Sequence, residues 1–367
     1  MSNKGLINEF FWLRCIACLA VVMGHSFQSS YNYYVQSEEQ IKSVYIDLYH
    51  VLYLGILFGT PVFVFISEFL LSKRYSLNVP KGFIKKRLKF LLIPYAFMSI
   101  MYALTEMNKW TIEDLIIESS KNIFFGDSTV YFILIIFQFY FLHLFFNKHL
   151  NRLSPKKVIP IAFLINVLYL SIFNFFSPPN FPYAEYVWEK GYWIPFTGWI
   201  FYFILGYYCG KNYNQFLVFL HKYKILVISM PVFSFIIVLL LSKFIVIIPW
   251  SSKRIDMILY STSIILFIIY MSSRIKEVPK TVMFISRYSF SIYLLHQFFL
   301  MLFPYVKLPT FLNMISYIFC IFVLSISGSV IISYLLNRFS FGQYLVGAVK
   351  NYKKEKPLKV ERRKAVN

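Results

Sequence analysis

Five ionisable side chains interrupt long apolar stretches of the 367-residue sequence: Arg14, His25, Glu68, His143 and His296. Hydrophobic residues make up 58% of the chain and charged residues only 14%, whereas soluble domains average about 25% charged residues. Inside a membrane span, an ionisable side chain costs about 2.5–3.5 kcal/mol on insertion scales and usually marks function. These five residues are therefore the first candidates for chemistry.

Arg14 and His25 share one face of the first apolar stretch. They are eleven residues apart, which on a helix is about 20° beyond three full turns and about 16 Å along the axis. Histidine titrates near neutral pH and is the usual base for taking a proton from a hydroxyl. Snorkelling of Arg14 and an interfacial position of His25 would explain each residue singly. Their shared face favours a joint role.

The elements that carry these residues are predicted to be membrane-spanning helices, because a span needs about 20 mostly apolar residues. The sequence predicts an all-α integral membrane protein with about ten transmembrane helices and no separate soluble domain. We expect a transmembrane domain over 1–345 and a basic cytoplasmic tail over 346–367. The predicted spans are 8–27, 48–71, 90–105, 130–146, 158–176, 193–210, 225–248, 256–272, 282–304 and 308–336.

The distribution of charge predicts the orientation. Most of the 37 Lys and Arg residues fall in the N-terminus, the even-numbered loops and the tail, whereas the odd-numbered loops hold most of the acidic residues. Positive charge favours the cytoplasmic side, so both termini are expected to be cytoplasmic. The net charge of +21 then reflects orientation and contact with anionic lipid, and no nucleic-acid partner is expected.

Other polar residues extend the candidate site. His296, with Tyr293 one turn before it, is expected to approach His25 in depth, and a polar packing contact is the alternative. Glu68 is a candidate counter-ion for Arg14, because opposite charges stabilise one another once both are buried. Cys15 and Cys18 form a CxxC inside an apolar helix, where helix packing is the favoured explanation, and no metal site is expected.

Four segments resemble, in order, the membrane-bound acyltransferase 3 family. They are WLRCIACLAVVMGH (12–25), FGTPVFVFISEFLLSKRY (58–75), FIKKRLKFLLIPY (83–95) and SRYSFSIYLLHQFF (286–299). Within the family the chain is most similar to the intercellular adhesion C type of poly-N-acetylglucosamine systems, through KRLKFLLIPY and GWIFYFILGYYCG. It departs from the family pattern at Glu68, where glycine is common, and at Lys86 and Lys89, which partly replace arginines.

The resemblance implies an O-acyltransferase of the bacterial plasma membrane. It would move an acetyl or succinyl group from cytoplasmic acyl-CoA, a co-substrate rather than a tightly bound cofactor, to a hydroxyl of a surface polysaccharide or its lipid-linked precursor. Polysaccharide synthase proteins would be further partners.

In this reading His25 is the base or a transient acyl carrier. Arg14 would orient the donor near its thioester. The basic turn suits the CoA phosphates through charge-assisted hydrogen bonds, with Arg87 as the main candidate beside Lys86, Lys89 and Arg74. Ordinary positive-inside charge is the alternative explanation of that turn.

Two other functions compete with acyl transfer. One is a polysaccharide exporter or flippase without acyl-transfer chemistry, a role also attached to the adhesion C type. The other is a small-solute transporter, which predicts inverted repeats with paired broken helices. The sequence contains no such repeats.

Overall fold

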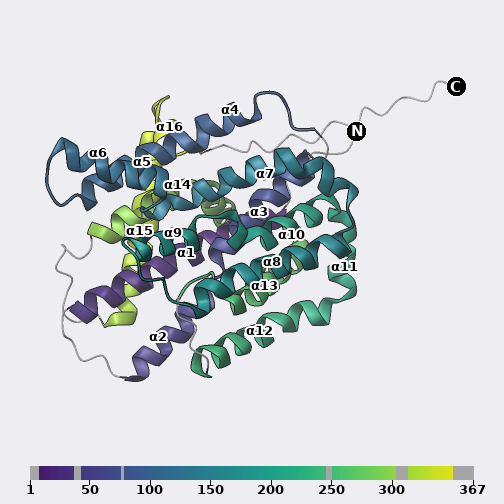
Figure 1. The fold of residues 1–367 in the computed structure, drawn as a ribbon. Helices are drawn as coiled ribbons and strands as arrows, with labels where there is room; N and C mark the ends of the chain where they lie inside the picture. Colours follow the sequence, from purple (N-terminus) through teal and green to yellow (C-terminus); the bar gives the residue numbers. More distant parts are fainter. Residues whose placement is uncertain (1–7, 37–42, 76–77, 245–249, 303–312, 350–367) are drawn as a thin grey trace.

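Every element of the described chain is a helix. The computed structural model describes residues 8–36, 43–75, 78–244, 250–302 and 313–349 (Figure 1). The α-helices are α1 (Asn8–Gln36), α2 (Ser43–Ile56), α3 (Gly59–Arg74), α4 (Phe83–Arg87), α5 (Ile93–Glu106), α6 (Ile112–Ser120), α7 (Phe132–Arg152), α8 (Pro155–Phe175), α9 (Ala184–Trp193), α10 (Ile200–Lys211), α11 (Tyr213–Lys222), α12 (Lys224–Phe244), α13 (Ile255–Ser273), α14 (Lys280–Leu302), α15 (Met314–Leu336) and α16 (Gly342–Leu345). Short π and 3₁₀ segments complete them: η1 (Leu88–Leu92), η2 (Lys121–Phe125), η3 (Thr129–Tyr131) and η4 (Phe196–Trp199).

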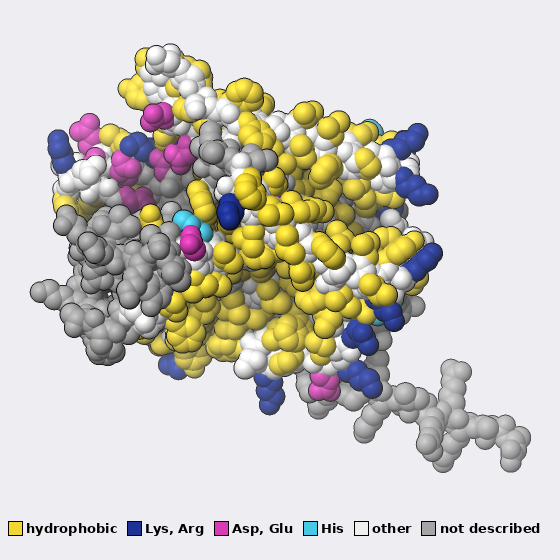
Figure 2. Space-filling view, turned by 90° about the horizontal axis from the view of Figure 1, so that it is seen from below, with side chains coloured by type: hydrophobic (Ala, Val, Ile, Leu, Met, Phe, Trp, Pro, Cys, Tyr) yellow, Lys and Arg dark blue, Asp and Glu magenta, His cyan; other side chains and the backbone are white. Residues whose placement is uncertain are grey.

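A broad apolar band separates two polar ends of the molecule. Figure 2 shows Lys and Arg mostly at one end, Asp and Glu mostly at the other, and hydrophobic side chains between them. Eight segments of the described chain are long and apolar enough to cross a membrane: Asn8–Tyr31, Asp47–Arg74, Phe83–Glu106, Ile112–Arg152, Pro155–Phe175, Lys224–Phe244, Ile255–Ser273 and Met314–Leu336. This confirms the prediction of an all-α integral membrane protein.

Opposite charges gather at the two polar ends, the basic end and the acidic end. The basic end carries, among others, Lys73, Arg74, Arg87, Lys211 and Arg274. The acidic end carries, among others, Glu113, Asp114, Glu118, Asp127 and Glu189.

Two of the roughly ten predicted spans are not among those eight segments. The predicted span 193–210 corresponds to α10, which is only 12 residues long. The predicted span 282–304 corresponds to α14, which has 23 residues but carries Arg287, His296 and Gln297. Both helices pack inside the bundle, α10 against α3 and α8, and α14 against α1 and α15. Polar side chains lower the hydropathy of α14. Several of them are tolerated because they are buried against other helices, among them Ser286, Ser289 and His296.

Helix ends differ from the predicted spans in several places. α1 continues to Gln36 instead of ending near residue 27, and the third predicted span belongs to a helical stretch that begins at Phe83. The predicted loops 106–129 and 177–192 contain α6 and α9. An apolar run marks the part of a helix suited to hydrocarbon, whereas the helix itself can continue into polar sequence. Residues 350–367 of the predicted tail lie outside the described residues.

Glycines allow α10 to pack closely on α3. A Cβ atom added at Gly206 would lie 2.6 Å from the carbonyl oxygen of Phe65, and one at Gly210 would overlap Ser72 Oγ and the carbonyl oxygen of Phe69. Small residues four apart let two helix backbones approach each other in this way. The two glycines thus fix the position of α3 against α10, and α3 carries Glu68 and Arg74.

The first helix lies at the centre of the bundle. α1 packs against α3, α13, α14 and α15 (Figure 1). A helix surrounded by other helices can carry polar side chains that do not meet lipid, which is the environment that Arg14 and His25 require.

Candidate active site

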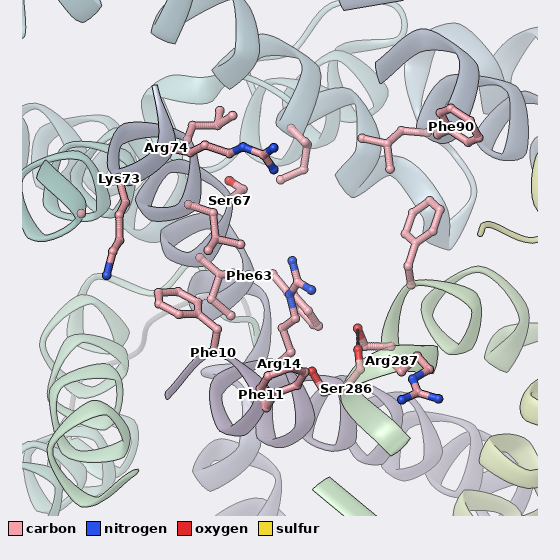
Figure 3. A pocket seen from close by; sticks show the side chains of 18 of the residues that line it. Phe10, Phe11, Arg14, Phe63, Ser67, Lys73, Arg74, Phe90, Ser286 and Arg287 are labelled. Atoms are coloured by element: carbon pink, nitrogen blue, oxygen red, sulfur yellow. Dashed lines mark hydrogen bonds between the residues drawn. The ribbon is translucent and has the colours of Figure 1, made fainter. Parts of the chain in front are cut away.

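A large cavity opens from the basic end and enters the bundle. Its volume is about 2100 Å³, and it is lined by residues of α1, α3, α4, α7, α11 and α14 among others. Arg14 of α1 and Arg74 of α3 point into the same open space, bordered by Ser286 and Arg287 of α14 (Figure 3). The cavity is therefore positively charged where it begins and is formed by helices far apart in sequence.

Part of the predicted basic turn lines this cavity. Arg74, Lys86 and Arg87 are among the lining residues of the described chain, and Lys89 is not. The Arg87 guanidinium lies 5.1 Å from the centre of the Tyr140 ring, and that ring also borders the cavity. Lys89 belongs to the π-helical segment η1, and its ammonium lies 5.0 Å from the centre of the Tyr344 ring. Three of the four predicted donor-binding residues thus line the cavity, and their role in donor binding stays a prediction.

Lys73, another basic residue near this turn, also lines the cavity. Lys73 Nζ lies 3.4 Å from the centre of the Tyr213 ring, and both residues line the cavity. Burial, and then the nearby Glu9 carboxylate, raises the pKa of Tyr213. The phenol therefore keeps its proton and offers a neutral aromatic face to the ammonium.

The inner end of the cavity is formed by aromatic residues. Phe63, Phe132 and Tyr293 are among its lining residues. The Tyr293 hydroxyl donates to the carbonyl oxygen of Thr129 at 3.0 Å and accepts from the Phe132 amide at 3.2 Å. Two backbone contacts thus fix the Tyr293 side chain in the wall of the cavity.

Beyond Tyr293 lie two histidines. The rings of His25 and His296 have their centres 5.2 Å apart and are tilted by 43°. The centre of the Tyr293 ring lies 6.2 Å from that of His296. His296 is fully buried and His25 is half-buried, with Gln28 as a hydrogen-bonding neighbour of His25. The structure brings His296 to His25, as the sequence predicts.

Glu68 has a partner that the sequence analysis did not propose. Glu68 Oε1 lies 2.6 Å from His143 Nδ1, and both side chains are fully buried. The expected ion pair between Glu68 and Arg14 stays a prediction. From the sequence, His143 is expected to be an interfacial residue near the inner end of its helix. That expectation is wrong, because the structure buries His143 completely against Glu68.

The two cysteines of the CxxC are free thiols buried between the helices of the bundle. Cys15 and Cys18 are both buried, and Cys18 Sγ donates to the carbonyl oxygen of Ser289 at 3.8 Å. Within the described chain no group of three His, Cys, Asp or Glu residues is placed to hold a metal ion. Their surroundings agree with the expected packing role.

The fold is that of a multi-pass membrane protein with a basic cavity, and comparison with known proteins identifies its family. A model described as an acyltransferase domain matches residues 7–334, so the chain belongs to the membrane-bound acyltransferase 3 family. The Bacillus subtilis (strain 168) protein YfiQ, provisionally named a membrane-bound acyltransferase, is 39% identical over 363 residues, which cover 95% of this chain and 97% of YfiQ.

More distant relatives carry a different name. The probable poly-β-1,6-N-acetyl-D-glucosamine export protein of Staphylococcus aureus (strain Mu50 / ATCC 700699) is 27% identical over 80% of this chain and 82% of its own length. That of Staphylococcus epidermidis is 27% identical over 78% of this chain and 79% of its own. No solved structure matches the chain. The family match and the membrane-spanning helices together make the chain a multi-pass membrane acyltransferase.

Proposed function

We propose that this acyltransferase moves an acyl group from acyl-CoA, bound in the cavity at the basic end, to a hydroxyl of a cell-surface polysaccharide or its lipid-linked precursor. The observation that carries the proposal is the alignment of the cavity with two histidines. The cavity runs from the basic end to Tyr293, and His296 and His25 continue from there toward the acidic end.

The positive charge at the cavity suits a CoA donor. Arg74, Lys86 and Arg87 line the cavity near its opening, and charge-assisted hydrogen bonds from such groups hold phosphates. Arg14 lies deeper, where it would orient the thioester or stabilise the charge that develops on it. The donor, acetyl-CoA or succinyl-CoA, is a co-substrate in this proposal, and no tightly bound cofactor is needed.

His25 has the chemistry for the transfer itself. It would take the proton of the acceptor hydroxyl as that oxygen attacks the thioester carbon, and the carbon–sulfur bond would break to release CoA. The alternative is that His25 carries the acyl group for part of the way. Both forms need an imidazole at the inner end of the donor path.

The acceptor is proposed from the relatives and from the site together. Several relatives are named for the export of poly-β-1,6-N-acetyl-D-glucosamine, a polymer rich in hydroxyl groups. In the proposed orientation the basic end faces the cytoplasm, where acyl-CoA is made, and the acidic end faces the polymer. A synthase would supply that polymer as a partner of this protein.

Replacing His25 with alanine tests the proposal. We expect surface polysaccharide of normal abundance that has lost its O-acyl groups, measured by mass spectrometry of the purified polymer. His149→Ala is the matched control, because His149 is exposed and lies away from the cavity lining. Loss of surface polymer with unchanged acylation of the intracellular pool would instead show an exporter.

A further inference from the structure

The protonation of His296 can be assigned from its contacts. His296 Nδ1 lies 2.8 Å from the carbonyl oxygen of Tyr293 and 3.0 Å from that of Ile292. Carbonyl oxygens only accept hydrogen bonds, so Nδ1 must carry the proton that it donates to them. In the neutral imidazole the other nitrogen, Nε2, then holds a lone pair.

That lone pair is buried without a hydrogen-bond donor among the described residues. His296 is fully buried, and its Nε2 has no hydrogen-bond partner among the described residues. A buried acceptor left without a partner costs about 1–3 kcal/mol, and such groups in native proteins call for an explanation. Ser325 does not supply the partner, because its hydroxyl donates to the backbone carbonyl of His296 at 2.7 Å.

The neighbouring ring is that of His25. The two ring centres are 5.2 Å apart, and they come from α1 and α14, which pack along one another. Catalytic hydrogen bonds are often long in the absence of substrate and shorten when it binds. A small rotation of the half-buried His25 would therefore bring one of its nitrogens toward His296 Nε2.

We propose that His296 is a positioning residue that accepts a proton from His25 during acyl transfer, an inference that rests on the proposed function of His25. As one nitrogen of His25 takes the proton of the acceptor hydroxyl, the N–H proton on its other nitrogen passes to Nε2 of His296. The acceptor oxygen bonds to the acyl carbon, and the carbon–sulfur bond breaks. The proton then returns through His25 to the CoA thiolate, so that the product is CoA thiol and both histidines are neutral again.

The backbone around His296 suits this role. When Nε2 is protonated, the ring carries a positive charge, and its Nδ1–H still points at the two carbonyl oxygens of Ile292 and Tyr293. Hydrogen bonds from a charged donor are about twice as strong as neutral ones. The same two contacts therefore fix the neutral tautomer and stabilise the charged form.

Two substitutions separate this role from a structural one. In His296→Asn, the amide can still donate to the carbonyls near the Nδ1 position but places nothing at Nε2. In His296→Gln, the amide oxygen reaches the Nε2 position and can orient His25, but it cannot take a proton. The same changes at the exposed His149 are the controls.

The measurement is acyl transfer by the purified full-length protein, with kcat and the KM for acyl-CoA determined separately. General acid–base groups contribute about 10²–10⁴-fold, so we expect kcat to fall about 100-fold or more in His296→Asn. We expect kcat to fall at least about tenfold in His296→Gln, because the amide orients without accepting the proton. The KM should stay near that of the unchanged protein, since His296 is not a lining residue of the cavity.

Other outcomes are equally decisive. A His296→Asn variant with unchanged kcat would overturn the inference, as would a His296→Gln variant with unchanged kcat if the Asn variant does not fold. Acyl transfer that survives His25→Ala would refute the proposed function itself. Loss of transfer in His25→Ala with full activity in both His296 variants would refute only the role of His296.

Discussion

Arg14 and His25 lie on the same face of one helix but meet different surroundings. Arg14 points into an open cavity that begins at the basic end, whereas His25 faces a buried histidine of another helix. About three helical turns separate the two side chains. In the proposed reaction, this one helix would supply a charge near the donor and a base farther from the basic end.

A prediction at the scale of single residues concerns the donor. Replacing Arg87 with glutamine removes a cation from the cavity lining, and a hydrogen bond to a charged group is worth about 1.5–3 kcal/mol. We therefore expect the KM for acyl-CoA to rise about 10–100-fold with little change in kcat, in a steady-state assay.

The chain offers a matched control for this change. Lys89→Gln removes the same charge two residues away, from a side chain outside the cavity lining, and should leave the KM near its original value. Equal effects of the two substitutions would mean that the basic turn acts only through its overall charge.

The buried pair of Glu68 and His143 belongs to the same scale. Removing one partner would leave the other buried without its hydrogen bond, which typically costs about 1–3 kcal/mol. The pair joins α3 to α7, and both helices line the cavity. Its position suggests that it holds two cavity walls at a fixed distance.

At the scale of helices, two kinds of contact set the geometry of the bundle. Glycines bring the backbones of α3 and α10 together, as described above. Asparagines of α8 satisfy backbone groups of other elements: Asn166 Oδ1 accepts from the Phe201 amide at 3.1 Å, and Asn174 Oδ1 accepts from the Ile255 amide at 2.9 Å. A few small or polar residues thus fix how these apolar helices pack against one another.

Substitution of the α10 glycines tests this account of the bundle. Gly206→Ala places a Cβ atom against the carbonyl oxygen of Phe65, and overpacking of this kind typically costs about 1–3 kcal/mol. We expect a lower thermal unfolding temperature in detergent, with a further decrease when Gly210→Ala is added.

Gly24→Ala is the control for stability, because nothing lies within 4 Å of the Cβ atom that it adds. Alanine also favours a helix over glycine by about 1 kcal/mol, so this change should leave the unfolding temperature equal or higher. Unfolding temperatures that fall alike in all three variants would contradict the close α3–α10 contact.

At the scale of the whole molecule, the separation of charge predicts how the protein lies in the membrane. We expect the basic end in the cytoplasm, so a cysteine at the exposed Ser154 should not react with an impermeant maleimide in intact cells. A cysteine at the exposed Glu113, at the acidic end, should react.

The unsubstituted chain provides the background for that labelling, since Cys15, Cys18 and Cys209 are buried and Cys320 is half-buried. The reverse pattern of labelling would place the donor cavity outside the cell, where acyl-CoA is absent. That result would contradict the proposed direction of transfer.

Much of the fold follows from the sequence, because the membrane allows few choices. Backbone polar groups must be satisfied within each span, so long apolar runs become helices. The predicted spans therefore match helices of the structure. The ends of the helices were harder to predict from hydropathy. The spans predicted at 193–210 and 282–304 correspond to α10 and α14, which are shorter or more polar than a typical span because both pack mainly against protein.

The Arg14–His25 register was determined by the sequence itself, since spacing along one helix is fixed at 3.6 residues per turn. Contacts between helices were decided only by the tertiary structure, because they depend on depth, rotation and the glycines that permit close approach. The pairing of Glu68 with His143, the position of Lys89 away from the cavity and the protonation of His296 all belong to that second class.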